Sequence, residues 1–269
     1  MSALIINADD LGASPAVNRA IADLHEAGLV TSASLIVNLP HSAEAAELAH
    51  QMPRLSVGVH LNLTKGRPLL PSRHVPSLVD GHGQFYTSPE FYRRAVLGQI
   101  NWHEAAAELE AQIEWALSRG LTVDNLDTHV HFHLLPAGRR LTLQLARRYG
   151  IPAWRSPNVL HTLFPSSAWN DLLARPPERG ELASPDYLLS LHHWGERLLT
   201  DSRVARLLSQ PDVVAELVVH PGYAPDPDLP LPDQLPPDYR QGEVNLVRSP
   251  DFRRWLDRLG CRLVTFADL

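Results

Sequence analysis

The chain has 269 residues, of which 44% are hydrophobic and 20% are charged, so it is long enough to bury a sizeable core. Its formal net charge is −6 and it holds no Lys/Arg-rich run, which argues against nucleic acid or an anionic membrane as the main partner. The single cysteine, Cys261, excludes an intramolecular disulfide and a cysteine-based zinc site.

Short apolar runs alternate with helical patterns along the whole chain. The first apolar run covers residues 4–8, and Ser14-Pro15 then gives a good start for a helix that Gly28 ends. Further strands are expected at residues 32–37, 55–63, 123–128, 153–155, 213–219 and 262–266. Further helices are expected at residues 42–50, 104–119, 185–208 and 249–259, and around Leu141, Leu145 and Tyr149.

The alternation of strands and helices predicts parallel strand pairing. We expect a single distorted (β/α) barrel of about seven parallel strands, forming one domain over residues 1–269. An open, doubly wound sheet is the alternative, but no Gly-rich phosphate loop follows the first strand.

Three segments break the alternation. Residues 64–101 are rich in proline, glycine and aromatic residues, and we interpret them as an insertion over the barrel mouth. A Pro-rich loop is expected at residues 224–240, and residues 156–184 are expected to form a loop.

Polar residues gather where the predicted strands end, which is the catalytic end of an α/β barrel. Taken singly, each has a structural explanation: paired carboxylates suit a helix N-terminus, and one histidine after a strand is often structural or part of a turn. Together, all of them fall at the predicted catalytic end. The residues concerned are Asp9, Asp10, His60, His129, Arg155 and His220.

Three histidines alternate after the strand at residues 123–128. His129, His131 and His133 would share one face if the segment were extended. Such an arrangement indicates either a metal site or a polar lip of the barrel.

The residue types indicate a hydrolase that acts on an amide or an ester. Two imidazoles and one carboxylate leave open positions on a metal ion, which polarises a carbonyl and acidifies water. The adjacent pair Asp9-Asp10 supplies both a ligand and a base, and His220 supplies an acid. The same ligand types also suit a non-haem iron oxygenase, which remains the minority interpretation.

Five segments, in order along the chain, resemble motifs of the YdjC-like carbohydrate deacetylase family. They are NADDLG at residues 7–12, VTSASL at 30–35, GVHLNLTKGRP at 58–68, DTHVH at 127–131 and ELVVHPGY at 216–223. Leu11 stands where the family usually has Phe, and Thr128 stands for Ser. The chain is similar both to the chitooligosaccharide deacetylases and to the hopanoid-associated branch of this family.

The resemblance implies a barrel related to polysaccharide deacetylases and one divalent metal ion, described for the family as Mg²⁺ or Zn²⁺. It implies that Asp10, His60 and His129 bind the metal, that Asp9 is the general base and that His220 is the general acid.

Position adds three further candidates. Arg155 is expected to hold the substrate or orient the base, and Tyr223 to contact the substrate. His131 is expected to contact the substrate or to orient a metal ligand.

We therefore expect a metal-dependent deacetylase that acts on an N-acetylated sugar of the chitooligosaccharide type. The alternatives are a metal-dependent phosphoesterase or other amidohydrolase and, from another class, a non-catalytic sugar-binding protein. No apolar run is long enough to span a membrane and no signal peptide is visible, so a cytoplasmic protein is expected. The resemblance also implies a homodimer.

Overall fold

A parallel β-sheet forms the centre of the computed structural model, which describes residues 2–155, 158–159, 182–229 and 235–269. Within these residues the sheet order is β5-β4-β3-β2-β1-β7-β6, and β8 pairs with β1. All these pairings are parallel, as the alternation of strands and helices predicts. The strands are β1 (Ala3–Leu11), β2 (Ser32–Leu35), β3 (Ser56–Leu61), β4 (Asn125–Thr128), β5 (Ala153–Trp154), β6 (Tyr187–Ser190), β7 (Val214–Val219) and β8 (Arg262–Leu263).

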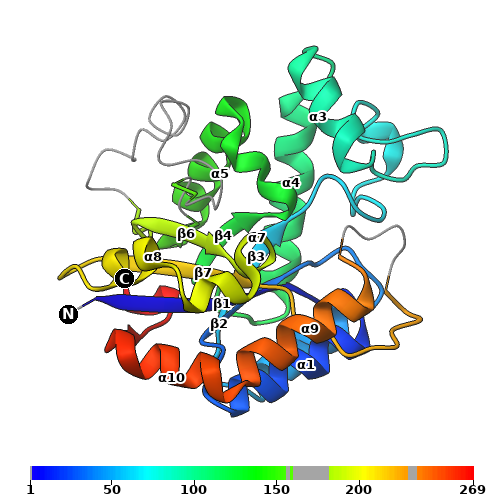
Figure 1. Cartoon of the computed structure of the whole chain (residues 1–269). Helices are drawn as coiled ribbons and strands as arrows, with labels where there is room; N and C mark the ends of the chain where they lie inside the picture. Colours follow the sequence, from blue (N-terminus) through cyan, green and yellow to red (C-terminus); the bar gives the residue numbers. More distant parts are fainter. Residues whose placement is uncertain (1, 156–157, 160–181, 230–234) are drawn as a thin grey trace.

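The sheet curls into a half-barrel (Figure 1). Isolated parallel bridges join Ala153 of β5 to Ala183, and Val159 to Leu188 of β6, so the two edges of the sheet approach each other. The predicted parallel α/β fold of the barrel type is confirmed, with a barrel that is only partly closed.

Helices surround the curled sheet and pack on its outer face. In Figure 1, α9 packs with α1 and α10 below the strands, whereas α4 and α5 lie above them, against β3 and β4. The α-helices of the described residues are α1 (Pro15–Glu26), α2 (Ser42–His50), α3 (Ser88–Val96), α4 (Trp102–Ser118), α5 (Pro136–Tyr149), α7 (Leu191–Trp194), α8 (Ser202–Leu208), α9 (Pro237–Arg248) and α10 (Pro250–Leu259). Short 3-10 helices are η1 (Ser72–His74), η2 (His129–Leu134), η3 (Gly195–Leu199) and η4 (Phe266–Asp268).

One strand differs from the sequence prediction. Residues 185–208 were expected to be helical, but β6 occupies the start of this segment and pairs with β7, and helical turns follow it. Leu188 and Leu189 are both fully buried, because each face of this strand is covered. The strand therefore shows no alternation of polar and apolar residues that would reveal it.

Two of the three irregular segments contain regular structure. The 64–101 insertion includes η1 and α3, and the ring of Phe91 in α3 lies 6.0 Å from that of Phe132. Helix α9 begins at Pro237, a residue type that suits a first helical turn, so the predicted 224–240 loop is too long at its end. Residues 230–234, and most of the predicted 156–184 loop, lie outside the described residues.

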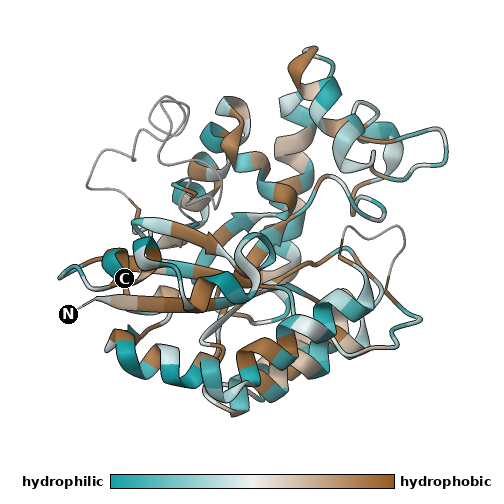
Figure 2. Cartoon of the chain, viewed as in Figure 1, coloured by the Kyte–Doolittle hydropathy of each residue, from teal (hydrophilic) through white to brown (hydrophobic). Residues whose placement is uncertain are grey.

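Apolar residues concentrate on the strands and on the helix faces turned toward them (Figure 2). Leu4, Ile5 and Ile6 of β1 are fully buried, as expected for a strand with both faces covered. Among the described residues, every helix is too short or too polar to cross a membrane.

Replacing Gly58 with alanine is expected to destabilise the sheet beneath the candidate site. A Cβ atom on Gly58 would lie 2.4 Å from Oδ1 of the buried Asn125 on the neighbouring strand. Such overpacking costs about 1–3 kcal/mol in the free energy of unfolding. Urea denaturation measures the loss. Gly242→Ala is the control, because no atom lies within 4 Å of its added Cβ. Equal stability of the two variants would contradict the prediction.

Candidate active site

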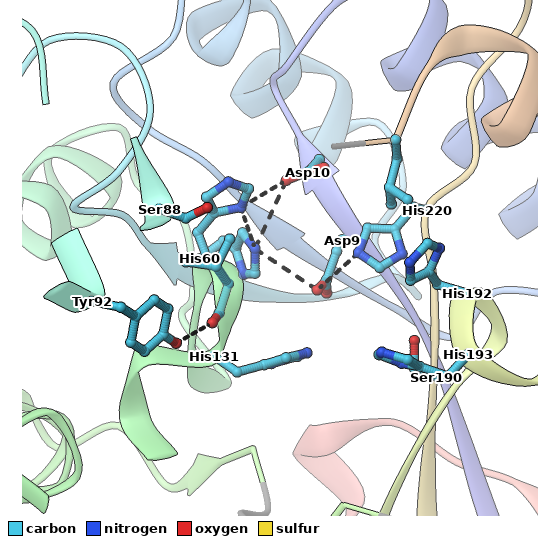
Figure 3. A pocket seen from close by; sticks show the side chains of 13 residues that line it. Asp9, Asp10, His60, Ser88, Tyr92, His131, Ser190, His192, His193 and His220 are labelled. Carbon is cyan, nitrogen blue, oxygen red and sulfur yellow. Dashed lines mark hydrogen bonds and ion pairs between the residues drawn. The ribbon is translucent and has the colours of Figure 1, made fainter. Parts of the chain in front are cut away.

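Parallel strands bring the predicted polar residues to one end of the sheet. Asp9 and Asp10 come from β1, His60 from β3, His220 follows β7, and His129 follows β4. These five side chains line one pocket, a cavity of about 310 Å³ (Figure 3). The other described residues that line it are Ser88, Tyr92, Val130, His131, Ser190, His192, His193 and Leu235.

Asp10, His60 and His129 form a group that can hold a divalent metal ion. Asp10 Oδ1 lies 3.8 Å from His60 Nε2 and 3.4 Å from His129 Nδ1, and the two ring nitrogens are 3.3 Å apart. Ligand atoms at about 2.1 Å from a tetrahedral ion are themselves about 3.4 Å apart. Within the described residues, Asp10 Oδ1 is buried without a hydrogen bond. The donor set and its spacing therefore fit the ion that the sequence implies.

Asp127 orients His60 toward this group. Asp127 Oδ1 lies 2.7 Å from His60 Nδ1, which leaves His60 Nε2 directed at Asp10 and His129. Ser34 Oγ donates to the other oxygen of Asp127 at 2.5 Å. Sequence reasoning gave Asp127 no role, although a carboxylate two residues before His129 at a strand end was a usable signal.

Burial and neighbouring charge act in opposite directions on His60. Burial lowers the pKa of His60, but the carboxylates of Asp127 and Asp9 outweigh it and raise this pKa to about 8. These carboxylates therefore favour a positive charge at His60.

Arg155 holds Asp9 through both carboxylate oxygens. Its NH1 donates to Asp9 Oδ2 at 2.9 Å and its NH2 to Asp9 Oδ1 at 2.6 Å. The same guanidinium lies 2.7 Å from Asp127 Oδ2, and its Nε donates to Glu216 Oε1 at 2.9 Å. All four side chains are buried. Arg155 thus contacts both oxygens of Asp9, and its predicted role of orienting the base stays a prediction.

Arg155 and burial have opposite effects on the pKa values of Asp9 and Glu216. Burial raises the pKa of Asp9, but Arg155 and then His60 lower it by more, so this carboxyl stays ionised. Burial prevails at Glu216, whose pKa rises to about 7 despite Arg155. Sequence reasoning did not identify Glu216, which lies inside an apolar strand.

His220 faces Asp9 across the pocket. Its Nε2 lies 3.8 Å from Asp9 Oδ2, and its main-chain N–H donates to Glu243 Oε2 at 2.5 Å. Burial lowers the pKa of His220 to about 4, against the opposite effects of Asp9 and Asp10. The predicted base and acid therefore lie within one site, next to the metal-capable group.

The segment after β4 is not extended, so the prediction that His129, His131 and His133 share one face is wrong. Val130 and His131 have left-handed backbones, with φ of 53° and 56°, and the chain turns within η2. His133 turns away and lies 2.6 Å from Thr128 Oγ1. The hydroxyl of Tyr92 in α3 donates to Val130 O at 2.5 Å and thereby ties the insertion to this strained turn.

His131 and the start of α7 line the pocket from two facing sides. His131 points across the pocket toward Ser190 and His193 (Figure 3). The sequence did not reveal the β6–α7 side because β6 itself was missed. Tyr223 is not among the described lining residues, and its hydroxyl donates to Asp23 of α1. Its position does not support the predicted contact with substrate.

The chain is similar to known proteins over most of its length. A family model described as "YdjC-like protein" matches residues 3–258. A carbohydrate deacetylase of Brevibacillus brevis is 33% identical over 267 residues, which is 99% of each chain. A carbohydrate deacetylase of Vibrio parahaemolyticus is 29% identical over 271 residues, covering 99% of this chain and 96% of the relative. An Enterococcus faecalis crystal structure, described as "a putative cellobiose-phosphate cleavage protein", has a TM-score of 0.81 at 28% identity and covers 99% of this chain and 98% of that chain.

Arg155→Met is expected to lower the free energy of unfolding by about 3–5 kcal/mol, because it leaves buried carboxylates without their cation. Denaturant unfolding measures this loss. Arg203→Met is the control, since Arg203 pairs with Asp201 while 46% exposed, and such pairs contribute about 0–1 kcal/mol. A loss no larger than that of the control would show that Arg155 does not carry the charge balance of the site.

Proposed function

The chain belongs to the YdjC-like family, and on that premise we propose that it is a carbohydrate deacetylase that removes the acetyl group from an N-acetylated sugar. The observation that carries this proposal is the group Asp10, His60 and His129 beside the ionised Asp9 in one pocket. Whole-length relatives named carbohydrate deacetylase support the same reaction class.

Asp10, His60 and His129 would hold one divalent ion, which supplies Lewis acidity toward the acetyl carbonyl and lowers the pKa of water. Two imidazoles among three protein ligands favour zinc, cobalt or manganese over magnesium on chemical grounds. Both Mg²⁺ and Zn²⁺ belong in the experiment below, because the family resemblance implies either.

Asp9 is the proposed general base. Arg155 holds both of its oxygens, so the carboxylate is oriented and ionised before the substrate arrives. Asp9 takes a proton from the attacking water as the acetyl carbon is attacked.

His220 is the proposed general acid. Its Nε2, 3.8 Å from Asp9 Oδ2, is placed to receive a proton from Asp9 and to give it to the departing amine nitrogen of the sugar. Acetate and a free amine are then the two products, with the proton of water transferred to the amine.

His131, Ser190 and His193 are the proposed contacts of the sugar hydroxyls, since they line the same pocket as the reacting groups. A cavity of about 310 Å³ lies at the small end of ligand sites. We therefore propose that one acetylated residue of a chitooligosaccharide enters the pocket, with any further residue outside it.

A phosphoesterase is the weaker candidate. Phosphoryl transfer requires cationic groups around the transferred oxygens, yet the described lining contains no lysine or arginine. Arg155 is fully buried and already engaged by Asp9 and Glu216. The homodimer and the cytoplasmic location remain predictions.

The purified protein is expected to release acetate from diacetylchitobiose, to lose this activity with a chelator and to regain it with Zn²⁺, Mg²⁺, Mn²⁺ or Co²⁺. Acetate detection together with quantification of the free amine measures the reaction. Release that is unaffected by the chelator would exclude metal dependence. No release with any of the four metals would exclude this substrate class.

Asp9→Asn is expected to lower kcat at least about 100-fold while the protein still binds metal, because the base is lost but the three ligands remain. Steady-state kinetics and metal analysis on the same sample make the comparison. A kcat close to that of the wild type would remove Asp9 as the base.

His60→Ala combined with His129→Ala is expected to abolish metal uptake, since two of the three ligands are removed. Elemental analysis after dialysis gives the stoichiometry. His50→Ala is the control, because the ring of His50 lies against Arg119 O on the surface. Metal retained at the wild-type ratio by the double variant would disprove the ligand assignment.

A further inference from the structure

Two charged side chains of helix α9, one turn apart, contact the strand ends where the proposed catalytic and metal-binding residues lie. Arg240 NH2 lies 2.5 Å from Asp10 Oδ2, and Glu243 Oε2 accepts the main-chain N–H of His220 at 2.5 Å. Only 1% of Arg240 and 3% of Glu243 is exposed. Neither residue belongs to the metal-capable group.

We infer that Arg240 and Glu243 are positioning residues. Arg240 fixes the carboxylate of Asp10 for metal binding, and Glu243 fixes the main chain that carries His220. This inference rests on the function proposed above.

The contact with Arg240 makes the two carboxylate oxygens of Asp10 different from each other. Oδ2 is engaged by the guanidinium, so Oδ1 is the oxygen that faces His60 and His129, at 3.8 and 3.4 Å. Asp10 also has a left-handed backbone, with φ of 70°, a conformation that surrounding contacts must maintain. A carboxylate held in this way presents one oxygen to the ion.

The guanidinium of Arg240 is itself held in place. Its Nε donates to Leu235 O at 3.2 Å, so it is anchored on the side away from Asp10. Gly222 leaves room for its aliphatic stem, because a Cβ at that position would lie 3.2 Å from Arg240 Cβ and Cδ. This fixed fork differs from a mobile counter-charge, and lysine would keep the charge without the fork.

Co²⁺ titration tests the role of Arg240 independently of turnover. In Arg240→Met and Arg240→Lys the affinity for Co²⁺ should fall about 10- to 100-fold, as for other residues that orient a metal ligand, and the visible absorption of the bound ion should change. Arg248→Met is the matched control, since Arg248 lies on the same helix but pairs with Asp23 at the surface. It should bind Co²⁺ like the wild type.

Circular dichroism and thermal unfolding show whether each variant is folded. If Arg240→Met does not fold, Arg240→Lys decides. Wild-type affinity and absorption in the folded Arg240 variants would overturn the inference for Arg240. If the wild type itself bound no Co²⁺, the proposed function would fail first.

Substitution of Glu243 should affect the proposed general acid His220, and therefore kcat, without changing metal binding. In Glu243→Ala, kcat for acetate release from diacetylchitobiose should fall about tenfold or more, because even small displacements of a reacting group slow catalysis. The affinity and absorption of Co²⁺ should stay as in the wild type. Glu243→Gln retains a carbonyl acceptor for the N–H of His220 and should restore most of the lost rate. Wild-type kcat in Glu243→Ala, or no recovery in Glu243→Gln, would overturn the assignment of Glu243.

Discussion

The charge balance around Arg155 is the constraint on which the site depends. Parallel strands that end together bring Asp9, Asp127 and Glu216 into one buried region, where unpaired charge is costly. The guanidinium lies within 2.9 Å of an oxygen of each. Its charge keeps Asp9 ionised, whereas burial raises the pKa of Glu216 to about 7. One cation therefore offsets part of the negative charge where these strand ends meet.

Asp10 and Asp127 each divide their two carboxylate oxygens between different partners. Asp10 gives Oδ2 to Arg240 and leaves Oδ1 toward the imidazoles. Asp127 gives Oδ1 to His60 and Oδ2 to Arg155 and Ser34. This division fixes orientation, because a carboxylate with one engaged oxygen can no longer rotate freely to offer the other. The arginines thus contribute geometry as well as charge.

The site residues that lie at strand ends could be predicted from the sequence. Those that reach the site through packing between distant segments could not. The ends of the strands at residues 4–8, 55–63 and 123–128 fix where the proposed ligands lie, because parallel strands share a catalytic end. Arg240 lies 230 residues from Asp10, on a surface helix whose pattern gives no sign of a buried cation. The strained turn at His131 was also missed, since alternating histidines equally suit an extended chain.

The two imidazoles of the metal-capable group differ in pKa, because nearby carboxylates raise that of His60 whereas burial lowers that of His129. In the absence of an ion, the carboxylates around His60 raise its pKa to about 8, so they favour a proton at this ring. The three residues would bind the proposed divalent ion with both rings neutral, so a proton at His60 would oppose its binding. The carboxylate of Asp127, which stabilises the protonated ring, would also orient His60 as a metal ligand.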